Sequence, residues 1–464
     1  MKRRFLAITL FAIAVQFISV QAEDWPTYRK DNSRSGVTSE ALQAPLSLEW
    51  LHQAKHAPKP AWPGPARRDG WHKVDNLKPR VIFDWAYHIV AADGKVFYGS
   101  SADDKVYCID ANSGEELWSF FTDAPVRLAP SYENGKLYVG SDDGNAYCLN
   151  ADNGELIWKK KPSSLDFRVS GHNRMMSLWP VRSGVLVDNG EAYFCAGLFP
   201  VEGVYVTAHN AENGDEVWTK KVENIPPQGY LLASDNKLYV PTGRGTPAVF
   251  DRKSGDYMYS LGGSGGSFAL LTGDMLVYGP GKTGELDAFA EESESSDQVA
   301  SFSGNHMVVT PERTFLHTDT EMSAIDRQRH TQLLAERREL EQQKKELTAK
   351  MKKLGRDLGG EEGLKIKGDL ESTMIRLGQI PKELEECMLW KKECKYPYSL
   401  ILAGDLLFAG GSGSVAAFSA KDGSEVWSQE VDGRALEIAV ADGRLLVSTD
   451  KGLVYAFNSQ SEEK

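Results

Sequence analysis

The chain has 464 residues, of which 41% are hydrophobic, and its 53 basic and 65 acidic side chains give a formal net charge of −12. This apolar fraction is enough to build a core, which excludes a chain that is disordered throughout. Nucleic-acid binding is not expected, because proteins hold phosphate backbones with clustered Lys and Arg. The 43 Gly and 11 Trp indicate many turns and strands anchored by aromatic side chains.

Residues 1–22 have the pattern of a secretory signal peptide. Three basic residues precede an apolar run from Phe5 to Val15, and Val20-Gln21-Ala22 places small residues at the expected cleavage positions, before Glu23. We therefore expect an exported protein, periplasmic or extracellular, with no membrane span after cleavage. The alternative is an uncleaved anchor, although the run is shorter than the ~20 residues of a membrane-spanning helix.

A repeat of about 40 residues fills most of the remaining chain. Residues 134–140 (Asn-Gly-Lys-Leu-Tyr-Val-Gly) match residues 93–99 (Asp-Gly-Lys-Val-Phe-Tyr-Gly) at a shift of 41. A second strand-like run follows each of them, and then a Gly and a Trp: Gly114 with Trp118, and Gly154 with Trp158. Short alternating apolar strands between Asx-Gly turns predict a small antiparallel sheet in each copy. Units of this length repeated around an axis are propeller blades.

Eight inner-strand signals predict an all-β, eight-bladed β-propeller, with seven blades as the alternative. They lie near residues 94, 135, 190, 236, 274, 306–315, 405 and 443. The last copy ends at Asn458 without an outer Trp strand, whereas Leu46–Trp50 resembles an outer strand without its blade. We expect this strand to complete the last blade and latch the two ends together, leaving no open sheet edge. A free N-terminal tail is the alternative.

Residues 327–389 break the repeat with 14 basic and 12 acidic side chains in 63 positions and no strand signal. Leucines recur every seven residues on both sides of a Gly-rich turn, at positions 333, 340, 347 and 354 and then 370, 377 and 384. Two such runs predict an antiparallel α-helical coiled-coil hairpin. Because Trp390 resumes the repeat, the hairpin is expected to interrupt one blade. The propeller then comprises residues 23–326 and 390–464.

The first half of this insertion, residues 327–358, carries 10 basic and 5 acidic side chains on an otherwise acidic protein. A protruding arm of opposite charge is a candidate docking element for a protein partner. The alternative is a solvated coiled coil that dimerises or has no partner.

Five Cys are present, in a compartment that permits disulfides. Cys387 and Cys394 are the candidate disulfide, because they lie seven residues apart across Trp390. Cys108 and Cys148 occupy the same place in successive repeats. We expect them to be buried and free, because packed sheets lie ~10 Å apart, beyond the ~7 Å limit for a bridge between Cα atoms. No spacing resembles a metal site.

Ligands of propellers usually bind at the mouth of the central channel. Aligning the strands through their turns puts Arg127 and Arg182 at equivalent positions of adjacent blades, with Gln228 at the next equivalent position. Two guanidiniums facing one channel could clamp a carboxylate or phosphate, so we expect a small anionic ligand. The alternative is that these arginines bridge blades through carboxylates.

An insertion lies near this column, because the Trp158 to Trp218 spacing exceeds the period by about 20 residues. Function concentrates in such loops. The candidates from it are Arg168, His172, Arg174 and Trp179, the last as a stacking surface. Arg244, in a polar turn, is a further candidate. No partner carboxylate can be identified for His172 from spacing, so no catalytic residue is assigned.

The unit Tyr-Cys-Ile-Asp-Ala-Asn-Ser-Gly-Glu-Glu-Leu-Trp at residues 107–118 resembles the tryptophan-docking repeat of pyrroloquinoline-quinone (PQQ) propellers. This superfamily includes quinoprotein alcohol dehydrogenases and outer-membrane assembly lipoproteins. Residues 24–29 and 99–107 resemble a bacterial exported subgroup of PQQ-binding-like repeat proteins. The resemblance covers nearly the whole mature chain and implies the propeller fold. It also makes PQQ a candidate cofactor, whose three carboxylates would suit the arginine pair.

The chain departs from both groups. Many of the dehydrogenases carry two adjacent Cys beside the cofactor and Glu, Asn and Asp ligands for calcium; this chain has no Cys-Cys pair and no trio that can be aligned, so calcium is not supported. The lipid-modified Cys of the lipoproteins is also missing. We therefore expect a ligand-binding or protein-interaction scaffold rather than an enzyme. The alternative is a PQQ-dependent quinoprotein dehydrogenase that oxidises an alcohol or sugar.

Overall fold

The structure is a computed structural model that describes residues 22–61, 81–171, 174–243, 245–263, 265–280, 284–291, 298–355 and 359–459, with the backbone at 68–69 and 74–75. In this part of the chain, six four-stranded antiparallel sheets follow one another, each with its strands in sequence order. They are β5 to β8 (Ile89–Ala92, Lys95–Ser100, Lys105–Asp110, Glu116–Phe121), β9 to β12 (Ser131–Glu133, Lys136–Gly140, Ala146–Asn150, Leu156–Lys160), β15 to β18 (Leu186–Asp188, Glu191–Ala196, Val204–Asn210, Glu216–Val222), β19 to β22 (Leu232–Ala233, Lys237–Thr242, Gly245–Asp251, Tyr257–Ser260), β23 to β26 (Phe268–Leu271, Met275–Gly279, Glu285–Ala290, Gln298–Ser303) and β27 to β30 (His306–Val309, Arg313–His317, Glu321–Asp326, Met388–Glu393).

A seventh, eight-stranded sheet joins the two ends of the chain. Its strands, in spatial order, are β1 (Val37–Thr38), β31 (Ser399–Ala403), β32 (Leu406–Gly410), β33 (Ser412–Ser419), β34 (Glu425–Ala441), β35 (Arg444–Thr449), β36 (Leu453–Ser459) and β2 (Leu46–Gln53). The long strand β34 pairs with β33 through its first part and with β35 through its last part. Strand β2 pairs with β36, so the strand predicted at Leu46–Trp50 is present and lies against the last strand of the chain.

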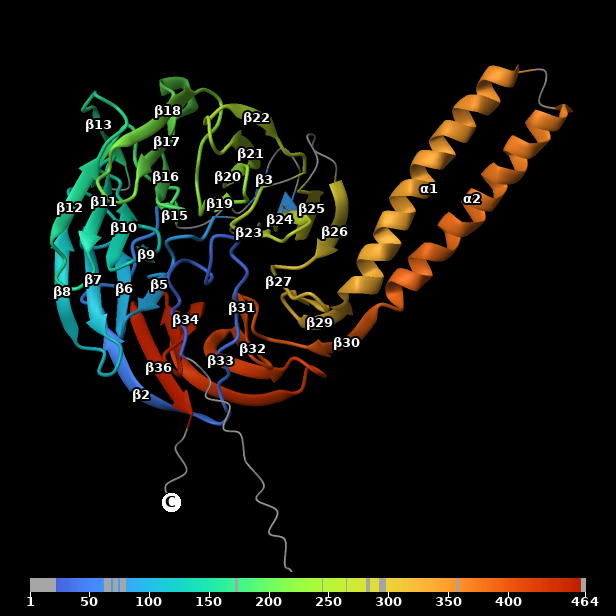
Figure 1. Cartoon of the computed structure of the whole chain (residues 1–464). Coiled ribbons are helices and arrows are strands. Elements are labelled where there is room, and N and C mark those ends of the chain that lie inside the picture. Colours follow the sequence, from blue (N-terminus) through green and yellow to red (C-terminus); the bar gives the residue numbers. More distant parts are fainter. Residues whose placement is uncertain are drawn as a thin grey trace, which may run out of the picture.

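The sheets stand side by side around a common centre, as Figure 1 shows. Their cores lie between neighbours: Phe97 and Cys108 of one sheet pack in the same buried cluster as Leu137 and Tyr147 of the next. Two small hairpins lie outside this series, β3 with β4 (Arg68–Asp69, Val74–Asp75) and β13 with β14 (Arg168–Gly171, Arg174–Ser177). The fold is all-β with propeller-like sheets, as the repeat predicts.

The repeat tryptophans connect successive sheets. The indole N–H of Trp118 on β8 donates to the carbonyl of Ala151 in the next sheet at 3.1 Å. The same contact recurs between Trp50 and Ala111, Trp158 and Ala211, Trp218 and Arg252, and Trp390 and Ala420, and Trp427 donates to Leu46. Each ring except that of Trp427 also covers a glycine of the next sheet: a Cβ added at Gly154 would lie 2.6 Å from Cε3 of Trp118. The Trp and Gly of the repeat are therefore two halves of one contact.

Residues 23–40, here called the central segment, cross the middle of the ring (blue in Figure 1). Arg29 donates to the carbonyls of Leu400 and Met307, and Arg34 to that of Leu231, although both guanidiniums are buried. Other hydrogen bonds of the segment involve Ala91 on β5, Tyr132 on β9, Val187 on β15 and Leu271 on β23. This segment thus reaches every large sheet, at its innermost strand or, for Leu231, at the residue before it.

Two helices occupy most of residues 327–389, α1 (Arg327–Leu354) and α2 (Glu361–Glu385). They lie beside each other and project away from the sheets in Figure 1. Leu333 and Leu347 of α1 are buried, as are Ile366 and Ile380 of α2. The helices depart from β29 and return to β30 at paired positions, because Ile325 lies opposite Met388.

The predicted disulfide between Cys387 and Cys394 is wrong, since both residues are free and buried. Strand β30 separates them, and seven residues at about 3.3 Å each place the two thiols roughly 20 Å apart. Cys108, Cys148 and Cys195 are also free and buried.

The contact between Trp and Gly can be tested with two glycines of the first sheet. Gly94 and Gly114 both have positive φ, at +68° and +71°, but a Cβ at Gly94 meets nothing within 4 Å, whereas one at Gly114 meets Trp50 at 2.6 Å. We expect Gly114→Ala to reduce the free energy of unfolding by about 1–3 kcal/mol more than Gly94→Ala, because only the former displaces an indole. Denaturant titration measures both, and equal losses would contradict the docking contact.

Candidate functional site

Arg127 and Arg182, predicted from equivalent positions of neighbouring repeats, meet on one carboxylate. Arg182 donates from Nε to Oδ1 of Asp142 at 2.6 Å and from Nη2 to Oδ2 at 2.7 Å, and Arg127 donates from Nε to the same Oδ2 at 2.7 Å. Asp142 lies in the turn between β10 and β11, and all three side chains are buried. The equivalent positions therefore converge, and the carboxylate between them belongs to the protein.

A second carboxylate extends this cluster. Nη1 of Arg127 donates to Oδ2 of Asp84 at 2.8 Å and to the carbonyl of Lys59 at 3.0 Å. Asp84 is 1% exposed, and its Oδ2 also accepts from the amide of Ala61. Its Oδ1 has no hydrogen-bond partner among the residues that the structure describes. The two guanidiniums are thus matched by two buried carboxylates, Asp84 and Asp142.

The electrostatics of Asp142 follow from this pairing. Burial on its own would raise the pKa of the carboxyl group, but the charges of Arg182 and Arg127 and their hydrogen bonds outweigh it, so the pKa lies below its ordinary value. Asp142 is therefore ionised at neutral pH and neutralises the arginines directly. Arg127 and Arg182 therefore bridge neighbouring sheets through carboxylates. The alternative to an anion clamp describes this arrangement.

A second buried polar contact involves His88, which follows Asp84 by four residues, and Glu437. His88 pairs through Nδ1 with Glu437 at 2.8 Å, and its ring packs edge-on against Tyr28 of the central segment. Tyr28 in turn stacks on Tyr230 with ring centroids 3.7 Å apart, and the Tyr230 hydroxyl accepts from the amide of Ala129. Nε2 of His88 is buried and has no hydrogen-bond partner in the described part of the chain.

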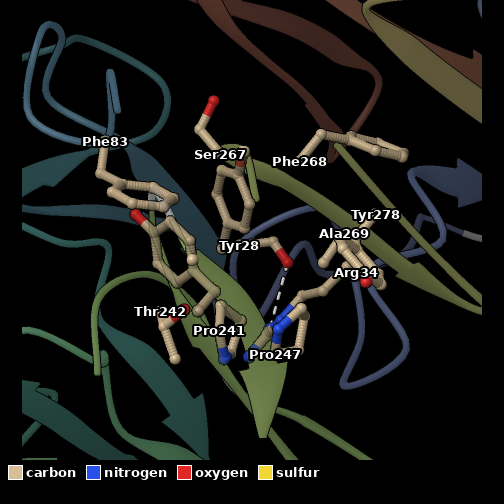
Figure 2. Close-up of a pocket in the computed structure, with 13 residues that line it drawn as sticks. Tyr28, Arg34, Phe83, Pro241, Thr242, Pro247, Ser267, Phe268, Ala269 and Tyr278 are labelled. Atoms are coloured by element: carbon tan, nitrogen blue, oxygen red, sulfur yellow. Dashed lines mark hydrogen bonds between the residues drawn. The ribbon is translucent and has the colours of Figure 1, made fainter. Parts of the chain in front are cut away.

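Figure 2 shows a cavity beside these aromatic rings. Tyr28 and Arg34 of the central segment contribute to its wall, joined by a hydrogen bond of 3.1 Å from Nη1 of Arg34 to the Tyr28 carbonyl. Phe83, Thr242 and Tyr278 also line it. The free space is about 10 Å³, close to what one water molecule needs. In this structure, side chains fill the space next to the central segment.

The other predicted site residues are dispersed. Trp179 is 4% exposed and donates from Nε1 to the Gly203 carbonyl at 3.1 Å, so its ring is core and offers no stacking surface. Arg174 on β14 pairs with Asp104 and donates to the carbonyl of Ala102 at 2.5 Å. Arg168 on β13 is exposed. Gln228 lies beside Thr242 in a backbone bridge, and His172 and Arg244 lie outside the described residues.

Sequence reasoning missed Asp84, Asp142, His88 and Glu437. One signal was available for Asp142: the 41-residue shift places it on Ser101, so a charged residue replaces a neutral one at an equivalent turn. No comparable signal marks Glu437, which lies 349 residues from its partner His88. Such pairs depend on which inner segments converge in the ring.

The arginine cluster can be tested as a site for PQQ, which the resemblance suggests. A tricarboxylate needs cationic donors that are not already neutralised, but the guanidiniums of Arg127 and Arg182 are bound to Asp142. The buried oxygen that lacks a partner among the described residues belongs to Asp84, and a carboxylate oxygen would repel an anion. The described residues at the cluster therefore do not fit PQQ. Within the described ranges there is also no group of three His, Cys, Asp or Glu side chains placed to hold a metal ion.

The sheets around one centre and the docking contacts between them define a β-propeller. A family model described as outer membrane protein assembly factor BamB matches residues 65–196 and 389–463 of the chain. Over these residues, slightly less than half of the chain, it is similar to PQQ-like repeat proteins. No curated protein matches it by sequence.

Solved structures share the fold at low identity. The quinohemoprotein alcohol dehydrogenase from Comamonas testosteroni is similar with a TM-score of 0.58 and 12% identity, over 95% of this chain and 81% of that one. A europium-containing methanol dehydrogenase is similar at 0.54 and 11%, over 91% and 89%. The computationally designed Ika8 protein is similar at 0.54 and 10%, over 80% and 96%. In the described part of this chain, neither helix has the length and apolarity to cross a bilayer.

The arginine cluster predicts a defined response to acid. The folded pKa of Asp142 is depressed, so its contribution to stability is complete above the unfolded value of about 4 and is lost as pH falls through the folded value. We expect Asp142→Asn to cost about 3–5 kcal/mol of unfolding free energy at pH 7, because it leaves two buried arginines short of charge. The loss should shrink below pH 4.

The matched control is Asp152→Asn. Asp152 pairs with Lys95 at 2.9 Å, but it is 77% exposed, so its removal should cost at most about 1 kcal/mol. Denaturant titrations between pH 3 and pH 7 measure both variants. Equal, small losses would show that the arginine cluster does not stabilise the ring.

Proposed function

We propose that this protein is an exported, eight-bladed PQQ-like propeller that acts as a scaffold and binds a protein partner through its helical arm, α1 with α2. Six four-stranded sheets supply six blades, and the two halves of the eight-stranded sheet supply two more. Strand β2 latches the last blade. The helices form an antiparallel hairpin inserted between the third and fourth strands of the sixth blade, and residues 1–22 direct export.

The observation that carries this proposal is a contrast between the channel and the arm. At the channel, Arg127 and Arg182 are buried and matched by Asp84 and Asp142. On the arm, by contrast, three large apolar side chains of α2 are exposed: Leu364 by 60%, Met374 by 52% and Ile375 by 58%. Exposed apolar groups that gather on one element mark interaction surfaces.

The chemistry of the arm indicates the kind of partner. Met351 of α1 and Leu370, Met374 and Ile375 of α2 line an open groove along the hairpin. Helix α1 carries nine Lys and Arg and four Glu, on a chain whose net charge is −12. The arm therefore suits a partner that combines apolar anchors with an acidic rim, which is the general form of a helix-in-groove contact.

A site-specific crosslink tests this docking. A photo-reactive residue at Ile375, in protein expressed with its leader, should give one discrete crosslinked species, because the partner covers this side chain. The control position is Val201, which is 94% exposed in the short 3-10 helix Pro200–Glu202 between β16 and β17. Met374→Ser should reduce the yield several-fold without changing the unfolding midpoint. Equal yields at both positions would overturn the proposal.

A second experiment deletes residues 327–387, which contain both helices. Because Ile325 lies opposite Met388, a short Gly-rich turn can join Asp326 to Met388 without moving either strand. The shortened chain should unfold cooperatively and lose the crosslinked species. Non-cooperative unfolding would show that the helices are an integral part of the ring.

Calorimetric titration with PQQ, with and without calcium, distinguishes the scaffold from the alternative function, a PQQ-dependent dehydrogenase. We expect no saturable heat from the wild type, because the donors of Arg127 and Arg182 are already bound to Asp142. Saturable heat that disappears in the Arg127→Ala, Arg182→Ala double variant would favour the dehydrogenase. A circular dichroism spectrum of the double variant controls for loss of fold.

A further inference from the structure

The backbone amide nitrogen of Glu23 contacts a buried carboxylate. It donates to Oε2 of Glu40 at 2.8 Å, and Glu40 is only 1% exposed. The other oxygen of Glu40 accepts from the amide of Gly443, in the turn between β34 and β35. The Glu40 carboxylate thus joins the start of the central segment to the eight-stranded sheet near the end of the chain.

Glu40 differs from comparably buried carboxylates. Among the described residues, four Asp or Glu side chains are less than 5% exposed: Glu40, Asp84, Asp142 and Glu437. Asp84 and Asp142 pair with Arg127, and Glu437 pairs with His88. Glu40 has no cationic partner in the described part of the chain, and both of its hydrogen bonds come from neutral amides. A buried charge without a counterion is costly, so this position calls for a cation.

The surroundings add to this demand. The Glu23 side chain accepts hydrogen bonds from Lys30 at 2.8 Å and from Thr38 at 2.7 Å. These bonds hold residue 23 in place, and the ammonium of Lys30 is bound to the Glu23 carboxylate. Burial raises the pKa of Asp24, and the charges of Asp93 and Asp442 act in the same direction. The start of the central segment therefore lies in an excess of negative charge.

We propose that cleavage between Ala22 and Glu23 creates the missing cation: the new α-ammonium group of Glu23 forms a partly buried ion pair with Glu40 and locks the central segment in the ring. The inference rests on the export step of the proposed function. Hydrolysis of the Ala22–Glu23 peptide bond consumes one water and leaves a carboxylate on Ala22 and an ammonium on Glu23. The nitrogen already lies at hydrogen-bonding distance from Oε2, so no movement is needed to form the pair.

This pairing makes removal of the leader a step in maturation. An uncleaved chain offers Glu40 only a neutral amide, whereas a chain that begins at Glu23 offers a charge-assisted donor. Because the central segment contacts every large sheet, the pair acts on the whole ring. The ammonium group must be that of residue 23 itself. A chain that began one residue earlier would carry its ammonium group on Ala22, which is exposed.

The pH dependence has a definite sign. An α-amino group has an ordinary pKa of about 7.7–8.0, and pairing with Glu40 raises it in the folded state. The stabilisation is therefore complete below about pH 8 and is lost as pH rises through the folded value. The charged groups around the amine are the carboxylates of Glu40, Glu23, Asp24, Asp93 and Asp442 and the ammonium of Lys30. Most of these groups are negatively charged, and a nearby negative charge also raises the pKa of the α-amine.

The direct test is the pKa of the α-amine in the exported protein, labelled by ¹³C reductive methylation and followed by NMR. We expect a value at least one unit above 8 in the wild type, a clearly lower value in Glu40→Gln because the ion pair is lost, and no change in the remote control Asp152→Asn. An ordinary value in the wild type would overturn the inference. A first residue other than Glu23, determined by mass spectrometry of the exported protein, would also overturn it.

A stability cycle supplies the second readout. The mature chain is compared with one whose α-amine is acetylated, each with Glu40 and with Glu40→Gln. At pH 7, acetylation should lower the folding equilibrium constant about tenfold with Glu40 present and much less with Gln, since charge-assisted hydrogen bonds are the stronger ones. Equal effects in both backgrounds would refute the pair. Failure to be exported would instead refute the proposed function, while the amine of a recombinant chain beginning at Glu23 would still report on the pair.

Discussion

Five junctions between neighbouring sheets of the described ring depend on the same contact, an indole laid over a glycine. A four-stranded sheet has two apolar faces, and each is buried only when another sheet packs on it. The tryptophan fills the space above a positive-φ glycine and donates its N–H to a carbonyl nearby, so one residue supplies both packing and hydrogen bonding. Trp50 makes this contact from β2 to Ala111, and so extends the series across the junction of the two chain ends.

The same contact explains why a long insertion is tolerated in one blade. The helices leave the ring between β29 and β30, and Ile325 and Met388 remain paired at that point. Two residues further on, Trp390 still donates to Ala420 of the next sheet. Because the docking residue lies beyond the insertion, the interface between sheets is formed whatever precedes it. An arm at this position can therefore acquire a partner without disturbing the ring.

Local patterns in the sequence were sufficient to predict the sheets and the pairing of Leu46–Trp50, because strand alternation, Asx-Gly turns and the Trp period all lie within about 40 residues. The arginine column was also visible, since Arg127 and Arg182 occupy equivalent positions. Its carboxylates were not, because Asp142 is identified only once the neighbouring loops converge. The disulfide failed for a local reason: a strand lies between the two Cys, and it holds them apart.

The central segment was the least predictable element. It crosses the middle of the ring, where the sequence predicts a ligand-binding channel. Arg29 and Arg34 are buried and donate mainly to backbone carbonyls, and no sequence pattern identifies such acceptors. Burial lowers the pKa of Arg34 to about 10, which still leaves it charged at neutral pH. Two cations bound to the carbonyls of inner segments hold the sheets from within. The centre of this propeller is therefore a structural core, which favours the proposal that recognition takes place at the peripheral arm.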